Sequence, residues 1–436
     1  MLKQVCATRM RASSSVLKVK GGWAGSVSYV APPSKSYSHR SLLISAVSKG
    51  VSRITGLSKC DDVEATLRAL SLMGVPVSTR GGEVLVEGGW LRSPSGEVYC
   101  GGSASTLRML APVLAAKPSY AVYTGDDSLR RRSVRMLEEA FATLGVEASS
   151  ANGKPPLKVR SNGFKTNTVI LDASESSQHV SGFLIAGATL GNGFQVVLKN
   201  RVLVSKPYVE LTMRMLSMHS VKTSLDGETI MVEPGEPKPF NHTVPGDYSL
   251  SAIPLAMAAV SGGSVKVHGL VDEPQPDREI VEILSRMGLK IGWSGNTLIA
   301  ENTGLLKACV IDCSGIPDLV PALALAATAA EGETILRNVG RLESKESTRA
   351  TLITRALSKM GVKTFFNGDE ILIEGPCRLR GAAVDAGGDH RIEMMLIMAG
   401  AVAEGETTIL NAGSVSKSNP GFYSWVLETG VKLQWV

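Results

Sequence analysis

The sequence predicts an α/β protein built from six copies of one supersecondary unit, with buried helices and outer sheets. Three observations support this fold class. The same helix ending recurs six times, an apolar run of helix length recurs in register with it, and the chain of 436 residues is too long for a single core. We therefore expect two similar halves, each containing three units.

The repeat is clearest where the second helix of each unit ends on a small residue followed by Val or Leu. Successive small residues lie 68 to 75 residues apart, as expected for one unit copied along a chain. The six endings are Met73-Gly74-Val75, Leu144-Gly145-Val146, His219-Ser220-Val221, Met287-Gly288-Leu289, Met360-Gly361-Val362 and Thr429-Gly430-Val431.

The fifth unit gives the order of elements. Residues 317–330 form an apolar run of helix length, and residues 334–336 have the composition of a strand. After a polar loop at 341–345, residues 346–360 repeat at helical spacing and residues 365–373 predict a hairpin. The first helix is apolar on every side and should be buried, whereas the second is amphipathic and should cover a sheet face.

Each buried helix is expected to begin with residues typical of a helix N-terminus, where free N–H groups and the helix dipole favour anions. The first three starts are rich in Ser and Gly, and the last three each carry one Asp. Any one start is most simply an ordinary cap, but six in register predict an anion-binding surface. They are Pro33-Ser34-Lys35-Ser36, Gly102-Ser103-Ala104-Ser105, Glu175-Ser176-Ser177-Gln178, Gly246-Asp247-Tyr248-Ser249, Ile316-Pro317-Asp318 and Gly388-Asp389-His390-Arg391.

Cations follow these starts, and two carboxylates lie among them. Asp318 is expected to cap a buried helix, and Glu346 follows Lys345 at the start of the next. A carboxylate among cations should be ionised and able to act as a base, although a cap or a structural ion pair is an equal alternative. The cations are Lys35, Arg40, Arg108, Arg132, Lys206, Lys345, Arg349, Arg391 and Lys417.

Composition excludes several other functions. A net charge of +6 over this length and 5% aromatic residues argue against nucleic-acid binding. No apolar run is long enough to span a membrane, and six cysteines without a CxxC pair are typical of free thiols in a reducing cytoplasm. P-loop, Rossmann and HExxH motifs are absent, so we expect neither a metal nor a cofactor.

These motifs resemble those of the 5-enolpyruvylshikimate-3-phosphate synthase family. The resemblance begins at Ser34-Lys35-Ser36-Tyr37-Ser38-His39-Arg40 and runs in order over nearly the whole chain after about residue 17. It continues through Asp61-Asp62-Val63, Thr124-Gly125-Asp126, Ser176-Ser177-Gln178, Ser205-Lys206-Pro207-Tyr208, Gly246-Asp247, Ile316-Pro317-Asp318, Lys345-Glu346-Ser347, Asp389-His390-Arg391 and Lys417.

The resemblance implies two similar domains of three βαβαββ units each, an inverse α/β barrel arrangement with the active site in the cleft between the domains. The chain would cross twice, giving a discontinuous domain of residues 1–32 and 245–436 and an inserted domain of residues 33–244. The implied reaction transfers the enolpyruvyl group of phosphoenolpyruvate to the 5-hydroxyl of shikimate 3-phosphate and releases phosphate. We expect a cytoplasmic monomer.

The resemblance also implies roles for individual residues. Asp318 would accept the hydroxyl proton, Glu346 and Lys35 are both candidates for proton transfer at the methylene carbon, and Lys417 would also take part in catalysis. Shikimate 3-phosphate would contact Lys35, Ser36, Arg40, Ser176, Ser177, Gln178, Ser205, Tyr208, Asp318, Arg341 and Lys345. Phosphoenolpyruvate would contact Lys35, Ala104, Arg132, Gln178, Arg349, Arg391 and Lys417.

The loop 102–105 departs from the family pattern Asn-(Ala/Ser)-Gly-Thr, because Gly102 replaces the Asn and Ala104 replaces a Gly. The extra methyl group predicts weakened inhibition by glyphosate. Two alternatives to the implied function are the enolpyruvyl transferase that acts on UDP-N-acetylglucosamine and a non-catalytic anion-binding scaffold. The first usually has Lys-Asn where this chain has Lys35-Ser36, and the second needs no carboxylates.

Overall fold

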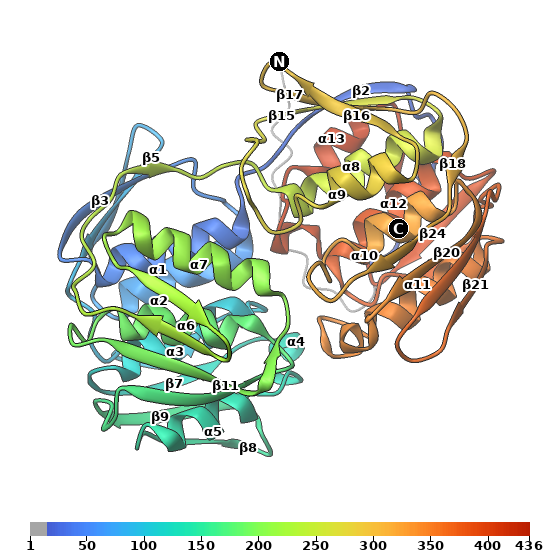
Figure 1. The fold of residues 1–436 in the computed structure, drawn as a ribbon. Helices are drawn as coiled ribbons and strands as arrows, with labels where there is room; N and C mark the ends of the chain where they lie inside the picture. The colour runs from blue at the N-terminus through green and yellow to red at the C-terminus, as the bar shows by residue number, and fades with distance from the viewer. Residues whose placement is uncertain (1–14) are drawn as a thin grey trace.

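The computed structural model describes residues 15–436, so Cys6 and the start of the expected discontinuous domain lie outside the described residues. The buried apolar side chains form two separate clusters. One cluster takes its residues from 37–244, and we call the body around it the inserted lobe. The other combines residues 17–31 with residues 248–431 and is the core of the discontinuous lobe. The two lobes lie side by side (Figure 1).

Each lobe contains three units, and each unit forms a small sheet that combines parallel and antiparallel strand pairs. The second unit shows the pattern, because its strands pair in the order β6-β7-β9-β8. The fifth unit has an extra parallel strand, and the sixth replaces the hairpin by pairing β25 with β1 from the other end of the chain. Within residues 15–436 the six sheets remain separate and do not join into a closed barrel. This arrangement is the α/β fold that the repeat predicted.

The inserted lobe contains the first three units. The first unit consists of β14 (His242–Thr243), α1 (Lys35–Val47), β3 (Gly50–Thr55), α2 (Asp61–Leu72), β4 (Val77–Arg80) and β5 (Glu83–Gly88). The second consists of β6 (Val98–Tyr99), α3 (Ala104–Ala115), β7 (Pro118–Thr124), α4 (Asp127–Arg130), α5 (Arg135–Thr143), β8 (Glu147–Ala151) and β9 (Lys154–Asn162). The third consists of β10 (Thr168–Ala173), α6 (Ser177–Gly187), β11 (Phe194–Leu203), α7 (Lys206–Met218), β12 (Thr223–Asp226) and β13 (Thr229–Val232).

The discontinuous lobe contains the other three units. The fourth unit consists of β2 (Ser26–Val30), α8 (Tyr248–Ser261), β15 (Ser264–His268), α9 (Ile280–Arg286), β16 (Lys290–Ser294) and β17 (Thr297–Glu301). The fifth consists of β18 (Leu306–Lys307), β19 (Val310–Asp312), α10 (Val320–Ala327), β20 (Ala330–Arg337), the 3₁₀ helix η1 (Gly340–Ser344), α11 (Arg349–Lys359), β21 (Lys363–Phe366) and β22 (Ile371–Gly375). The sixth consists of β23 (Ala383–Asp385), α12 (His390–Val402), β24 (Glu406–Leu410), the 3₁₀ helix η2 (Val415–Lys417), α13 (Phe422–Glu428), β25 (Lys432–Trp435) and β1 (Leu17–Lys20).

Three strands complete sheets from distant parts of the chain. Strand β14 pairs with β3, β2 pairs with β15, and β1 lies between β24 and β25. Between the lobes the two connecting segments run together, because Pro33 and Gly246 form an isolated β-bridge. The chain is therefore bound to itself at the point where it passes from one core to the other.

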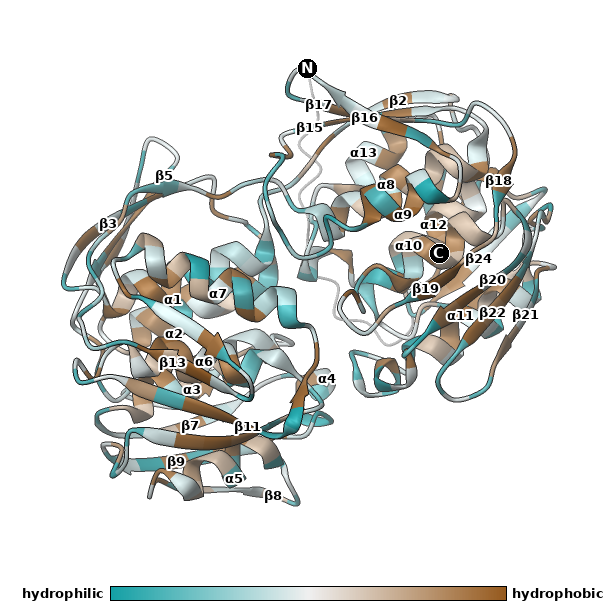
Figure 2. Cartoon of the chain, in the orientation of Figure 1, coloured by the Kyte–Doolittle hydropathy of each residue, from teal (hydrophilic) through white to brown (hydrophobic). Residues whose placement is uncertain are grey.

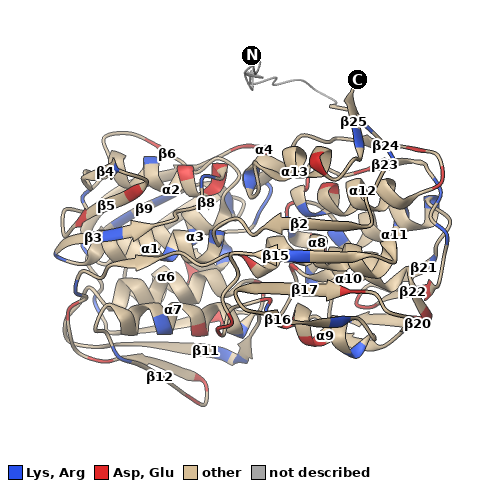
Figure 3. Ribbon diagram, turned by 90° about the horizontal axis from the view of Figure 1, so that it is seen from above, with Lys and Arg blue, Asp and Glu red and all other residues tan. Residues whose placement is uncertain are grey.

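The first helix of each unit is buried on nearly all sides, as its composition predicts. Every residue of α10 is buried, and so is almost every residue of α8 and α12. Figure 2 shows apolar residues on the helices inside each lobe and also along strands of the surrounding sheets, such as β11 and β20. Charged residues are instead distributed over both lobes (Figure 3).

The six small residues that mark the repeat all have left-handed backbone angles, with φ between 66° and 104°. Ser220 is the single member with a side chain. In the first five units the following residue donates its N–H back to the carbonyl five positions earlier, as Val75 does to Leu70 at 3.0 Å. This Schellman geometry explains the sequence signature, since it favours Gly at the turn and an apolar residue after it.

Five of the six buried helices begin at the predicted cap. Ser34, Ser103, Ser176, Asp247 and Asp389 each accept a hydrogen bond from a backbone N–H in the first turn. The sixth start differs, because α10 is preceded by Leu319 and has no side-chain cap. The expectation that Asp318 caps this helix is therefore wrong, and its carboxylate is free for other contacts.

Candidate active site

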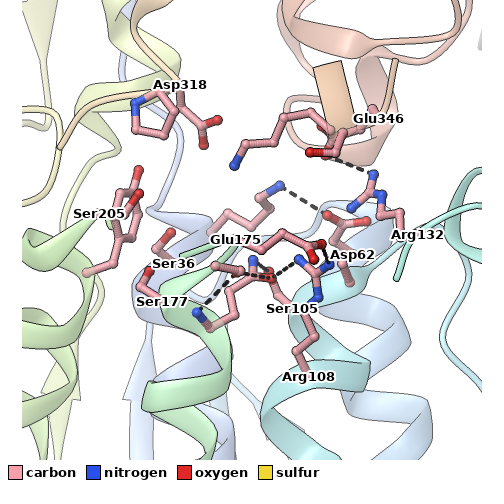
Figure 4. Close-up of a pocket in the computed structure, with 18 of the residues that line it drawn as sticks. Ser36, Asp62, Ser105, Arg108, Arg132, Glu175, Ser177, Ser205, Asp318 and Glu346 are labelled. Atoms are coloured by element: carbon pink, nitrogen blue, oxygen red, sulfur yellow. Dashed lines mark hydrogen bonds and ion pairs between the residues drawn. The ribbon is translucent and has the colours of Figure 1, made fainter. Parts of the chain in front are cut away.

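Five of the six buried-helix starts converge on one polar cleft between the lobes (Figure 4), whereas the start of α8 at residues 246–249 does not line it. Both lobes contribute, and most of the side chains are charged or carry a hydroxyl group. The cleft is lined by Lys35, Ser36, Arg40, Asp62, Ala104, Ser105, Arg108, Arg132, Glu175, Ser176, Ser177, Gln178, Ser205, Tyr208, Pro317, Asp318, Arg341, Ser344, Lys345, Glu346, His390 and Arg391.

Lys35 is the first residue of α1, and its ammonium lies 3.0 Å from the carboxylate of Asp62. Burial is the largest single influence on the pKa of Lys35 and lowers it, but Asp62, Cys60 and Glu346 together outweigh burial and the pKa is raised. Lys35 is therefore cationic at neutral pH. A charged amine at the edge of the cleft can bind an anion or donate a proton.

Arg40 has a largely structural environment. Its guanidinium donates to the hydroxyl groups of Thr212 at 2.7 Å and Ser181 at 3.0 Å, and to the carbonyls of Ser36 and Tyr208. These partners belong to α1, α6 and α7. Arg40 thus joins three helices of the inserted lobe while its edge faces the cleft.

A second group of polar side chains lies at the starts of α3 and α6. Gln178 donates to the hydroxyl of Ser105 at 2.7 Å, and its carbonyl accepts a hydrogen bond from Arg108. Arg108 also forms an ion pair with Glu175 at 3.0 Å. The hydroxyl of Ser176 accepts the N–H of Gln178, which fixes the start of α6.

The opposite wall is a network of carboxylates and guanidinium groups. Arg349 is fully buried and forms ion pairs with Asp318 at 3.0 Å, Glu346 at 2.7 Å and Asp389 at 2.9 Å. Arg391 holds the second oxygen of Asp318 at 3.0 Å. The Asp318 side chain remains 25% exposed, so this carboxylate is presented to the cleft with both oxygens oriented.

Electrostatics keep these carboxylates ionised. Burial raises the pKa of Asp318, but Arg391, Lys345 and Arg349 together lower it well below its usual range. The pKa of Glu346 is likewise lowered, because Arg132 and Arg349 outweigh its burial. Burial lowers the pKa of Lys345 to about 8, against the opposing effect of Asp318.

Several contacts cross the cleft and join the two lobes. Arg132 of the inserted lobe lies 3.1 Å from Glu346, and Arg341 donates to the hydroxyl of Ser205 at 3.0 Å. The Tyr208 hydroxyl donates to Asp277 at 2.8 Å. Asp277 is buried with a left-handed backbone, and burial followed by the nearby Asp318 raises its pKa to about 7.

The structure brings fifteen of the seventeen predicted site residues together around the cleft. The two others lie just outside it. Arg349 is behind the carboxylates that it orients, and the ammonium of Lys417 lies 3.4 Å from the carbonyl of Gly388, beside the start of α12. Both belong to the same region, but neither is part of the lining.

Sequence reasoning missed Asp62, Glu175, Ser344, His390 and Asp277 as site residues. Asp62, Glu175 and His390 stand inside quoted motifs, so their position next to predicted residues was an available signal. Asp277 was undetectable, because it lies in the loop between β15 and α9, and it approaches the site through Tyr208 and the nearby Asp318.

This arrangement can neutralise two anionic reactants and move protons between them. Cationic groups from both lobes face one another, and ionised carboxylates stand among them as bases. Within residues 15–436 no group of three His, Cys, Asp or Glu side chains has the geometry of a metal site, and no helix is long and apolar enough to cross a membrane. Fold and site together define a two-lobed α/β enzyme for small polyanionic substrates.

Comparison with known proteins identifies the family. Residues 23–425 match the sequence pattern of EPSP synthase (3-phosphoshikimate 1-carboxyvinyltransferase). The chain is 37% identical over 410 residues to 3-phosphoshikimate 1-carboxyvinyltransferase from Aeropyrum pernix, covering 93% of each sequence. It is 34% identical over 410 residues to the enzyme of that name from Korarchaeum cryptofilum, covering 93% of this chain and 96% of that one.

A solved structure supports the same assignment. EPSP synthase from Acinetobacter baumannii superimposes with a TM-score of 0.79 at 27% sequence identity, covering 97% of this chain and all of that one. The chain belongs to the EPSP synthase family.

Proposed function

We propose that this protein transfers the enolpyruvyl (carboxyvinyl) group of phosphoenolpyruvate to the 5-hydroxyl of shikimate 3-phosphate and releases phosphate. Membership of the EPSP synthase family supports this function. The observation that carries it is the placement of ionised Asp318 and Glu346 together with Lys35 in one cation-lined cleft.

The reaction needs a base for the hydroxyl group, and Asp318 fits this role. Arg349 and Arg391 hold one oxygen each, which fixes the direction of the carboxylate. In the absence of substrate these ion pairs make Asp318 a weak base, because they stabilise its ionised form. When an anionic substrate group engages Arg391, the carboxylate loses part of that stabilisation, so substrate binding raises its basicity.

The second proton transfer protonates the methylene carbon of phosphoenolpyruvate. Glu346 and Lys35 both line the cleft and are the two candidates. Glu346 is held by Arg132 and Arg349, and Lys35 by Asp62. The hydroxyl oxygen bonds to the central carbon of phosphoenolpyruvate, which gives a tetrahedral intermediate with a methyl group. This intermediate then loses phosphate and one methyl proton, which restores the C=C bond in the enolpyruvyl product, and Arg132 is placed to offset the negative charge of the departing phosphate.

Substrate contacts follow from the same geometry. We propose that the hydroxyl groups at the starts of α6 and α7, together with Arg341 and Lys345, hold the shikimate phosphate, since helix N-termini favour anions. The phosphoenolpyruvate group would contact Arg132, Arg391 and Gln178. Arg349 would support this subsite through Asp318 and Glu346, because it does not line the cleft.

We also propose domain boundaries, an oligomeric state and a location for this chain. We assign residues 1–32 and 245–436 to one domain and residues 33–244 to the other, supported by the two core clusters, which change over near those positions. We further propose a monomer, since fifteen of the seventeen predicted site residues gather around one cleft between the two lobes of a single chain, and a cytoplasmic location, since free thiols at the described cysteines are typical of a reducing compartment.

A phosphate-release assay with phosphoenolpyruvate and either shikimate 3-phosphate or UDP-N-acetylglucosamine tests the function. We expect release only with shikimate 3-phosphate. Asp318→Asn should reduce kcat by at least about a hundredfold, the lower range for one acid–base group. Asp226→Asn, at an exposed end of β12, is the control and should leave kcat unchanged. Release with the nucleotide sugar alone would favour the first alternative enzyme, and an unchanged Asp318→Asn rate would favour the scaffold.

A further inference from the structure

Glu393 is a buried carboxylate outside the cleft that the proposed reaction does not use. It lies on α12 two residues after Arg391, and its side chain is fully buried. One oxygen accepts the N–H of Gly413 at 2.9 Å and the hydroxyl of Tyr423. The other accepts the N–H and the hydroxyl of Ser414, both at 2.8 Å.

Hydrogen bonds rather than an ion pair stabilise this carboxylate. Within residues 15–436 no Lys or Arg forms an ion pair with Glu393, although burying an unpaired charge is costly. Four donors on two oxygens compensate for that cost. Burial and then the Glu393 charge raise the pKa of Tyr423 well above its usual value, so its phenol stays protonated and remains a donor.

The segment held by Glu393 carries two functional contacts. We call residues 413–417 the anchor loop. Ser416 donates to Asp61 at 2.8 Å, in the first turn of α2 on the opposite lobe. Lys417 approaches the carbonyl of Gly388, two residues before His390 in the cleft lining.

We propose that Glu393 is a positioning residue that fixes the anchor loop and thereby sets Lys417 beside the phosphoenolpyruvate end of the cleft. This role rests on the proposed function, in which Lys417 contacts phosphoenolpyruvate. Helix α12 controls the positions of both Arg391 and Lys417, since it carries Arg391 toward the cleft and Glu393 toward the anchor loop that holds Lys417. A rigid helix therefore sets the distance between Arg391 and Lys417.

The loop needs an anchor because it has little regular structure. Its hydrogen-bonded part is one short 3₁₀ turn, η2, and Gly413 has a left-handed φ of 99°. Ordering such a segment costs considerable backbone entropy, which the hydrogen bonds to Glu393 offset. In Glu393→Gln the amide cannot accept all four donors, so at least one backbone N–H loses its partner.

Steady-state kinetics on the full chain test this role. Glu393→Gln should raise the KM for phosphoenolpyruvate about tenfold, as expected for a weakened charge-assisted hydrogen bond. The KM for shikimate 3-phosphate should stay within about twofold. Tyr423→Phe removes one donor and should give a smaller change in the same direction. Phe141→Leu, a core substitution in the other lobe, controls for lost stability alone.

A double-mutant cycle separates positioning from a general structural role. If Glu393 acts through the loop, adding Glu393→Gln to Lys417→Met should raise the KM for phosphoenolpyruvate less than about twofold further. Effects that multiply in the double variant, or a wild-type KM in Glu393→Gln, would overturn the proposal. A wild-type protein that releases no phosphate would refute the proposed function instead, so the two failures are distinguishable.

Discussion

Replacing Arg349 by Met should destabilise the protein strongly, and more at neutral pH than in acid. Three carboxylates share this one guanidinium, which has no exposure to solvent. Asp318 keeps Arg391 and Glu346 keeps Arg132 in the variant. Asp389 is fully buried and loses its Arg partner, so about one buried charge is left uncompensated.

The magnitude follows from that count. Breaking a buried ion pair by removing one partner costs about 3–5 kcal/mol, so we expect a loss of that size in the free energy of unfolding at pH 7. The sign of the pH dependence follows as well. In the wild type the lowered pKa values of Asp318 and Glu346 give stability that is present above about pH 4 and lost as pH falls through the folded-state values. Without Arg349 the pKa values of Asp318 and Glu346 rise, so acid removes less stability from the variant than from the wild type. The difference in free energy of unfolding between the two proteins therefore narrows as pH falls.

Urea unfolding at pH 7 and at about pH 3, which lies below the unfolded-state pKa values of these carboxylates, measures both effects. Arg349→Lys keeps a cation but cannot contact three carboxylates at once, and it should lose about 1.5–3 kcal/mol. It also remains informative if the Met variant does not fold. A loss below about 1 kcal/mol in Arg349→Met, or a gap that widens in acid, would refute the reasoning.

Three further predictions concern the cleft. Because the pKa of Lys345 is about 8, kcat/KM should fall above that pH as the cation is lost, and Lys345→Arg should move this limb to higher pH in a pH–rate profile. Tyr208→Phe removes a contact between the lobes and leaves buried Asp277 without its donor, so we expect an about tenfold rise in the KM for shikimate 3-phosphate, with an unchanged KM arguing against that role. Ala104→Gly removes a methyl group from the cleft lining and should lower the inhibition constant of glyphosate, whereas equal inhibition of both forms would show that residue 104 does not control it.

The sixfold fold was predictable because its signals are local. A helix ending that needs a left-handed residue leaves a Gly or Ser in the sequence, and all six such residues have that backbone conformation. Apolar runs of helix length likewise predicted the buried helices. Strand exchange was harder to detect, since β14 and β1 are short and pair with strands almost 200 or more residues away.

The site was predictable as a set of residues but not as a geometry. Helix starts and motifs selected most of the lining, yet whether Arg349 faces a substrate or stands behind carboxylates depends on packing between α10, α11 and α12. The sequence likewise made Asp318 look like a helix cap, because Asp is among the residues preferred at a helix N-cap. Three-dimensional contacts with Arg349 and Arg391 decide otherwise.

Asp247 has a consequence for how the two lobes can move. Its carboxylate caps α8 through Leu250 and also accepts the backbone N–H of Lys35, the first residue of α1. The starting turns of two helices, one in each lobe, are thus fastened to the same side chain, next to the paired strands at Pro33 and Gly246. Rotation of one lobe would displace its outer sheets far more than this junction. Lys35 therefore sits near the axis of any such rotation, and cleft residues that lie farther from this junction would move more than Lys35 does.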